Sequence, residues 1–149
     1  MQNAKDHLRD IAGIRVICYF IDDIYNLVNA LKRQSELIFI REKDYIQNPK
    51  PNGYRSFHVI IAVPVYYLDI MEYFPVEIQL RTMTMDLWAS MEHRVCYKKL
   101  PEHRDELAEA FCQYADILGK IEEQFEAYNE TGMLEEIIPA QVTENPTEG

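Results

Sequence analysis

Basic side chains are concentrated in one short segment, Arg41–His58, where their type and spacing suit the binding of phosphate. The groups that are positive, or become positive on protonation, are Arg41, Lys43, Lys50, Arg55 and His58. They surround the turn sequence Asn52-Gly53-Tyr54. The whole chain has 15 basic and 25 acidic residues, a net charge of -10. We therefore expect the basic segment to hold one compact anion beside an aromatic side chain, which is typical of a nucleotide.

Two carboxylates, Asp10 and Glu77, lie on expected strands, and Glu77 is flanked by aliphatic residues. A carboxylate in such surroundings is costly unless it is paired or bound to a cation. Two carboxylates on different strands can share one Mg²⁺, which prefers oxygen ligands and keeps bound water and substrate phosphates. The alternative is an ordinary ion pair with an arginine, for example Arg15 or Arg81. The pattern alone leaves both readings open.

Tyr54 follows Asn52-Gly53, a turn pair that tolerates positive φ, and such a turn would project the ring as a platform. Stacking of a base on an aromatic ring is worth about 1–3 kcal/mol. A ring at a turn tip would support little of the core. In the alternative reading, Tyr54 is a partly buried packing residue and the neighbouring cations are a solvated loop.

The bulk composition describes one domain with a core. The chain has 149 residues, of which 48% are hydrophobic, and no apolar run approaches the roughly 20 residues of a membrane span. The start lacks the apolar core of a secretory signal. Cys18, Cys96 and Cys112 are too widely spaced for a zinc site, and we expect reduced thiols in a cytoplasmic protein. The acidic composition, with a pI near 4.8, argues against DNA as the main partner; contact with RNA stays open.

The expected fold is α+β, with a mixed, mainly antiparallel sheet of four to five strands flanked by helices. In chain order, we expect a strand at Arg9–Phe20, a helix from Asp22 or Asp23 to Arg33, strands at Glu36–Asp44, Arg55–Tyr66 and Tyr73–Leu80, a helix capped by Thr82 or Thr84, and a helix at Glu102–Tyr128. In the second strand, Leu37, Phe39 and Arg41 alternate against Ile38 and Ile40. We expect residues 1–130 to form the domain and residues 131–149 a polar, disordered tail.

Apolar residues recur at helical spacing in both C-terminal helices. The shorter helix places Leu87, Trp88, Met91 and Val95 on one face. The longer one has spacings of four and three, as in a coiled coil, at Leu107, Phe111, Tyr114, Leu118, Ile121, Phe125 and Tyr128. This stripe either packs on the chain's own sheet or is shared with another protomer.

Four ordered motifs carry a resemblance to a known family. They are D-I-A-G-I-R-V, R-E-K-D-Y-I, K-P-N-G-Y-R-S-F-H, and V-E-I-Q-L-R-T with the following W-A-S-M-E-H-R-V-C-Y-K. In order and spacing they resemble the synthetase domain of the RelA/SpoT family, in particular the small single-domain alarmone synthetases. The resemblance spans about Arg9–Lys98.

The resemblance implies a GTP or GDP pyrophosphokinase of the stringent response with a nucleotidyltransferase-like fold. Such an enzyme moves pyrophosphate from ATP to the 3′-hydroxyl of GDP or GTP and makes the alarmones ppGpp and pppGpp. It would use Asp10 and Glu77 as Mg²⁺ ligands, Glu77 also as the general base, and Arg15 against adenine. The residues it assigns to the acceptor nucleotide are Arg41, Lys43, Lys50, Asn52, Tyr54, His58 and Gln79. It also suggests a homotetramer.

One departure from the family concerns the donor nucleotide. Members of the family carry helices with basic residues before the first strand, whereas only Met1–Leu8 precedes Arg9 here. We therefore expect this chain to bind GDP or GTP and to make little or no alarmone. The alternatives are a guanine-nucleotide-binding module without catalysis, and an enzyme that pyrophosphorylates another acceptor such as tRNA. Tyr54 and Lys50 favour a guanine nucleotide over tRNA.

Overall fold

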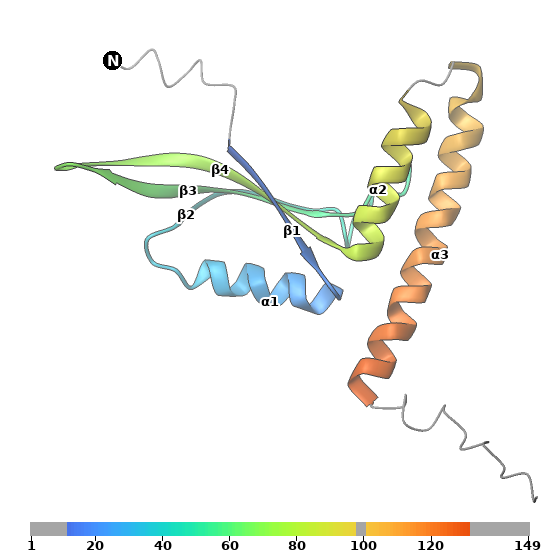
Figure 1. The fold of residues 1–149 in the computed structure, drawn as a ribbon, viewed down its shortest axis with the longest axis horizontal. Helices are drawn as coiled ribbons and strands as arrows, with labels where there is room; N and C mark the ends of the chain where they lie inside the picture. Colours follow the sequence, from blue (N-terminus) through green and yellow to red (C-terminus); the bar gives the residue numbers. More distant parts are fainter. Residues whose placement is uncertain (1–11, 98–100, 132–149) are drawn as a thin grey trace, which may run out of the picture.

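The structure is a computed structural model that describes residues 12–97 and 101–131. Its elements are β1 (Ala12–Cys18), α1 (Ile21–Lys32), β2 (Ile38–Asp44), β3 (Phe57–Tyr67), β4 (Ile70–Thr82), α2 (Met83–Cys96), a 3₁₀ turn (Pro101–His103) and α3 (Arg104–Thr131). The expected α+β fold is confirmed (Figure 1). Asp10 and the expected tail from residue 132 onward lie outside the described residues.

The sheet has four strands in the order β1-β4-β3-β2. Strand β1 runs parallel to β4, while β4 with β3 and β3 with β2 are antiparallel. The expectation of a mixed, mainly antiparallel sheet is therefore correct. Strands β3 and β4 continue beyond their neighbours as a long hairpin, which projects away from α2 and α3 (Figure 1).

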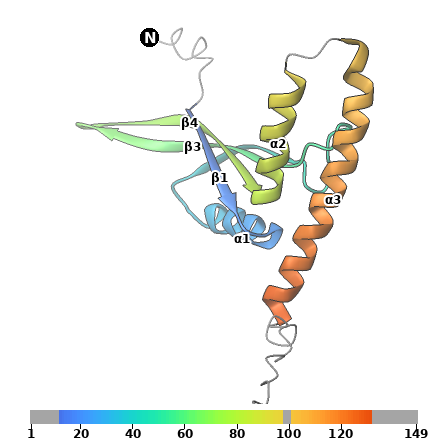
Figure 2. The same ribbon diagram turned by 45° about the vertical axis from the view of Figure 1, so that its right-hand side comes forward.

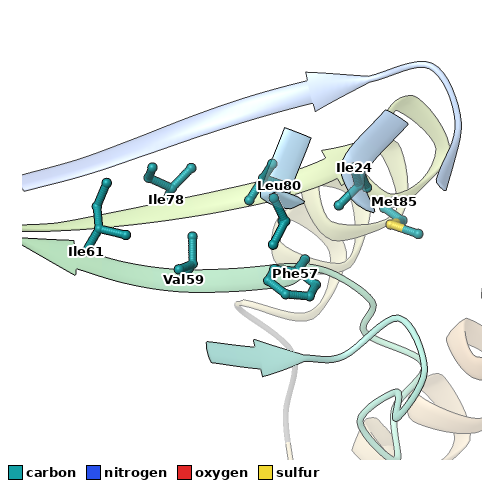
Figure 3. Packing of buried hydrophobic residues seen from close by; sticks show 8 residues of the cluster. Ile24, Phe57, Val59, Ile61, Ile78, Leu80 and Met85 are labelled. Atoms are coloured by element: carbon teal, nitrogen blue, oxygen red, sulfur yellow. The ribbon is translucent and has the colours of Figure 1, made fainter. Parts of the chain in front are cut away.

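The core lies between α1 and one face of the sheet. Side chains alternate between the two faces of a strand, so Val59 and Ile61 of β3 share a face with Ile78 and Leu80 of β4. Helix α1 covers this face with Ile24 and Val28, and Figure 3 shows the core side chains gathered along the two strands. Helix α1 does not cover the opposite face of the sheet, where polar side chains can be placed.

Helices α2 and α3 form an antiparallel pair at the end of the sheet (Figure 2). Trp88 of α2 is 4% exposed and packs against Phe111 and Ala115 of α3. Its indole Nε1 donates to the carbonyl oxygen of Phe111 at 2.7 Å. Of the apolar face expected for α2, only Trp88 is buried; Leu87, Met91 and Val95 are exposed.

The buried carboxylate of Glu122 in α3 forms hydrogen bonds with residues at the start of α2. Thr82 is the N-cap of α2, as expected, and its Oγ1 accepts from the Met85 amide at 3.4 Å. The hydroxyls of Thr82 and Thr84 both donate to the carboxylate of Glu122, which is 5% exposed. A buried carboxylate needs such donors, so this contact fixes α3 relative to the strand that ends at Thr82.

The apolar stripe of α3 does not pack on the sheet as a whole, so that expectation is wrong. Leu107, Phe111 and Leu118 pack in the cluster around Trp88, whereas Tyr114, Ile121 and Phe125 are exposed. Helix α3 has 28 residues and α2 has 14, so α2 covers only part of α3, and Ile121 and Phe125 lie beyond the cluster around Trp88. The alternative of a shared stripe stays a prediction. No helix in residues 12–97 and 101–131 has the length and apolarity needed to cross a membrane.

Two local expectations are corrected by the backbone. The N-cap of α1 is Phe20, and Asp23 instead accepts a hydrogen bond from the Phe20 amide at 3.0 Å. Strand β4 begins at Ile70 rather than Tyr73, because the chain reverses at Leu68-Asp69, where Leu68 has a φ of 51°. This turn contains no glycine, so the usual turn signal is missing.

A tyrosine in α1 stabilises the start of the loop after β2, and this gives a test. The Tyr25 hydroxyl donates to Asp44 Oδ2 at 2.8 Å, while Asp44 Oδ1 accepts from the amides of Ile46 and Gln47. Tyr25→Phe should lower the free energy of unfolding by about 1 kcal/mol, the usual value of one hydrogen bond. Urea unfolding at neutral pH measures this difference.

The difference in the free energy of unfolding between wild type and Tyr25→Phe should depend on pH. Burial, and then the hydrogen bond and negative charge of Asp44, raise the pKa of Tyr25 from its ordinary 10.0 to about 12. A raised folded-state pKa means that the stabilisation is complete below pH 10 and is lost as the pH rises through about 12. The stability gap between wild type and Tyr25→Phe should close over that interval. A constant gap would show that the hydroxyl is not the source of the difference.

Candidate functional site

The register of the sheet lines up polar side chains from all four strands on the face opposite α1. One row across the sheet consists of Lys43, His58, Gln79 and Arg15. The adjacent row, two residues along each strand, consists of Arg41, Ile60, Glu77 and Gly13. Residues two apart on a strand share a face, so both rows lie together. Residues that are far apart in the sequence are thus brought into one site.

A β-bulge in β2 places Arg41 on this face. Phe39 pairs with Ile61, but Arg41 pairs with Ile60, so Ile40 is an extra residue in β2. Without the bulge, Arg41 would share the face of Phe39, as the alternation of the sequence predicted. That expectation is wrong, because an inserted residue reverses the alternation beyond it.

The loop between β2 and β3 brings Lys50 and Tyr54 to the same face. Gly53 donates its amide to the Lys50 carbonyl at 2.8 Å, and Lys50 donates its amide to the Tyr54 carbonyl at 3.0 Å. The Asn52 side-chain oxygen accepts from the Tyr54 amide at 3.1 Å. These bonds close a tight turn, in which Gly53 has a φ of +97°.

The cationic side chains line a cavity of about 180 Å³ whose residues are Arg41, Lys43, Tyr45, Lys50, His58, Ile60 and Glu77. Lys50 Nζ lies 5.0 Å from the ring centroid of Tyr45 and 4.9 Å from that of Tyr54. Lys43 Nζ lies 5.8 Å from the Tyr45 ring. Aromatic faces attract ammonium groups at these distances. The rings therefore hold positive charge around one concavity, where it can neutralise phosphate.

Glu77 lies between this cavity and a second one. The second cavity, of about 230 Å³, is lined by Gly13, Ile14, Arg15, Glu77 and Gln79. The Glu77 Oε1 atom is 3.5 Å from His58 Nδ1 and 3.5 Å from Gln79 Nε2. Both contacts are long, so lone pairs of the carboxylate remain available to a proton or a cation.

The arginines that could have neutralised Glu77 are paired elsewhere. Arg15 Nη1 lies 3.6 Å and Arg81 Nη1 3.3 Å from Asp86 Oδ1. Among the described residues, neither arginine forms an ion pair with Glu77, so the arginine alternative for this carboxylate is wrong. Asp86 lies in the first turn of α2, where the helix dipole also favours its charge.

The surroundings of His58 disfavour its protonated form. Burial lowers the pKa of His58 below its ordinary value of 6.5. The carboxylate of Glu77 raises that pKa, while the positive charges of Arg81, Lys50 and Lys43 lower it further. The net direction is downward, so the imidazole offers one donor and one acceptor rather than a positive charge.

Tyr54 is both a packing residue and part of a cavity wall. Its ring packs edge-on against Trp88 and Tyr45, at centroid distances of 6.3 and 5.9 Å. It also lines a third cavity, of about 510 Å³, together with Arg15, Arg81, Ala89, Ser90, Glu92 and His93. The packing reading of Tyr54 is therefore correct, and a free turn-tip ring with little effect on the core is not what the structure shows. Stacking on a base stays a prediction, for which the ring has a cavity beside it.

Two of the expected site residues need separate comment. Asn52 lies away from the basic cavity: it lines a cavity of about 380 Å³ between α2 and α3, with Glu92, His93 and Cys96 among its neighbours. Asp10 lies outside the described residues, so its place at the site stays a prediction. Where the structure is described, the one group of three clustered acidic residues comprises Asp22, Glu126 and Glu130, which does not include Glu77.

Sequence reasoning missed two residues of the site. Tyr45 follows Asp44 directly and holds both lysines, and its place in R-E-K-D-Y-I was the available signal. Arg81 was considered only as an ion-pair partner of a carboxylate, yet its Nη2 donates to the Tyr54 hydroxyl at 2.9 Å.

Fold and site together define an α+β domain with a basic cavity on one face of its sheet. Residues 1–102 match the family described as a region found in RelA/SpoT proteins, and the chain belongs to the RelA/SpoT family. GTP pyrophosphokinase YwaC of Bacillus subtilis (strain 168) is 48% identical over 120 residues, which are 80% of this chain and 57% of that protein. The chain thus spans little more than half the length of this relative.

Solved structures give the same assignment. The small alarmone synthetase 2 from Bacillus subtilis has a TM-score of 0.74 at 46% identity, over 83% of this chain and 68% of that chain. The small alarmone synthetase 1 from Bacillus subtilis, bound to its product pppGpp, has a TM-score of 0.74 at 28% identity, over 89% of this chain and 68% of that chain.

Gly53 gives a test of the loop geometry. A Cβ at Gly53 would lie 3.0 Å from both Ala115 Cβ and Cys112 Cα of α3, and the backbone has positive φ. Gly53→Ala should therefore lower the free energy of unfolding by about 1–3 kcal/mol. The matched control is Gly13→Ala in β1, where a Cβ meets nothing within 4 Å. Equal stability of the two variants in urea unfolding would contradict the close approach of the turn to α3.

Proposed function

We propose that this chain handles the acceptor nucleotide of a pyrophosphokinase that transfers pyrophosphate from ATP to the 3′-hydroxyl of GDP or GTP. The observation that carries the proposal is the basic cavity, with the carboxylate of Glu77 at one side and the ring of Tyr54 near Lys50. The names of the relatives, and the product bound to one of them, support it.

In this proposal the cations bind the acceptor's 5′-phosphates and Tyr54 stacks on guanine. Arg41 and Lys43 reach one cavity from β2, and Lys50 reaches it from the loop that follows β2, so several charges act on one polyphosphate. Each hydrogen bond to a charged group is worth about 1.5–3 kcal/mol, which is enough for selective binding by a chain with net charge -10.

Glu77 is the proposed general base. The 3′-oxygen attacks the β-phosphorus of ATP, the bond from that phosphorus to the α,β-bridging oxygen breaks, and AMP leaves. The hydroxyl proton passes to the Glu77 carboxylate. Phosphoryl chemistry of this kind depends on in-line positioning and on charge neutralisation, and Glu77 faces both the basic cavity and the cavity that contains Arg15. Arg15 is the proposed partner of adenine.

The residues at Glu77 also fit a magnesium ion. The carboxylate has only long contacts, and it opens to a cavity where substrate phosphates and water can complete the coordination. Glu77, together with Asp10 by the family resemblance, would hold the ion. Bound Mg²⁺ would neutralise charge on the transferred phosphates. The remaining chemistry, which is orientation of the hydroxyl and uptake of its proton, belongs to the side chains.

The first test is binding of GDP by isothermal calorimetry. Lys50→Ala should weaken GDP binding by about 10- to 100-fold, because it removes one charge-assisted contact. The control is Lys32→Ala, which removes the same charge from α1, where Lys32 pairs with Glu42 at 2.7 Å. Equal GDP affinity of the two variants would contradict the phosphate site.

The second test concerns the chemical step. Glu77→Gln keeps the shape of the side chain but cannot take up a proton. In a version of the domain extended upstream by the helices with the basic residues, we expect transfer from labelled ATP to GDP to slow by about 100- to 10,000-fold, the usual effect of removing a general base, with GDP affinity nearly unchanged. Near-normal transfer by this variant would exclude Glu77 as the base.

A further inference from the structure

Arg81 lies beside the site and is used neither for phosphate nor for the base. It is 6% exposed and follows Gln79 by two residues on β4. Its Nη2 donates to the Tyr54 hydroxyl at 2.9 Å, its guanidinium carbon is 5.4 Å from the centroid of the Tyr54 ring, and its Nη1 is bonded to Asp86 at 3.3 Å. A buried guanidinium with two fixed partners has little freedom to turn.

The hydrogen bond from Arg81 leaves the Tyr54 hydroxyl proton available for a second hydrogen bond, whose direction depends on the tautomer of His58. Arginine only donates, so the Tyr54 oxygen is the acceptor and its own proton remains to be donated. Among the described residues, the acceptor within reach is His58 Nε2, at 2.9 Å from the Tyr54 oxygen. If Nε2 accepts, the ring proton of His58 is on Nδ1, which lies 3.5 Å from Glu77 Oε1.

We propose that Arg81 is a positioning residue, which fixes the Tyr54 ring and directs the hydrogen bonds from Arg81 to Tyr54 and from Tyr54 to His58, so that His58 turns Nδ1 to Glu77 at 3.5 Å. His58 then presents an N–H group to one oxygen of the carboxylate and leaves the other oxygen for the acceptor hydroxyl. The role in catalysis rests on the proposed function of Glu77. The direction of the chain of hydrogen bonds rests only on the contacts within the protein.

Asp86 contacts both Arg81 and Arg15, and Arg15 lines the second cavity. The same carboxylate oxygen that accepts from Arg81 lies 3.6 Å from Arg15 Nη1. Arg81 and Arg15 are on neighbouring strands, β4 and β1, and Asp86 is on α2. One carboxylate therefore holds both the residue that orients Tyr54 and the residue proposed for adenine, which fixes the two ring-binding positions relative to each other.

The test is the tautomer of His58, read from ¹⁵N–¹H correlation spectra of the ligand-free chain at neutral pH. We expect the Nδ1–H form of His58 in the wild type and a shift toward Nε2–H in Arg81→Gln. The signal of His103, which lies beside Glu106 and away from this cavity, should stay in place as an internal control. An Nε2–H tautomer in the wild type would overturn the proposal, as would the same tautomer in both proteins.

A second variant keeps the test decisive if Arg81→Gln does not fold. Tyr54→Phe removes only the hydroxyl, so the His58 tautomer should shift as in Arg81→Gln. An unshifted tautomer in Tyr54→Phe would overturn the proposal. In folded Arg81→Gln, GDP affinity should fall about tenfold, within the value of the stacking that a loosened ring loses.

The results that would refute the nucleotide site differ from those that would refute the positioning role of Arg81. If wild-type His58 has the expected tautomer and both variants change it, the positioning role of Arg81 stands. Absence of GDP binding to the same wild-type sample would then refute the nucleotide site alone. Unchanged GDP affinity in folded Arg81→Gln would refute the part of the proposal that concerns the Tyr54 ring.

Discussion

The alternation of side chains along the strands is the constraint on which the rest of this structure depends. One set of alternate residues, such as Val59 and Leu80, packs under α1, and the set between them, such as His58 and Gln79, is turned to the opposite face. Because each strand has a fixed register with its neighbour, burying the apolar set also aligns the polar set. The same pairing energy that builds the core therefore places Lys43, His58, Gln79 and Arg15 in one row.

The electrostatics of the site follow from this alignment and from the aromatic rings around it. Lysine ammonium groups repel one another, so they gather only where something stabilises their charge; here Tyr45 and Tyr54 lie under Lys50. Within the described part of the chain no arginine pairs with Glu77, because Arg15 and Arg81 both lie against Asp86. A chain that is acidic overall thus has a local positive cavity next to an available base.

Much of the fold and of the site could be predicted from the sequence, since periodicity and turn residues are local properties. The parts that could not be predicted depend on neighbours in space. Arg41 was placed on the wrong face because the bulge at Ile40 is fixed by pairing with β3. The stripe of α3 has uniform spacing, but its burial ends where the shorter α2 ends. Asn52 belongs to the same motif as Tyr54 and still faces a different cavity.

Tyr54 shows why a residue of this kind is hard to classify from a motif. A free ring at a turn would lose entropy each time it stacked on a base, so it would make a poor platform. Packing on Trp88, contact with Lys50 and the hydrogen bond from Arg81 fix the ring before any ligand arrives. In the proposed function, the contacts that make Tyr54 resemble a core residue would also hold its ring ready to stack on a base. Packing and the proposed recognition would then follow from one arrangement, and they need not be treated as alternatives.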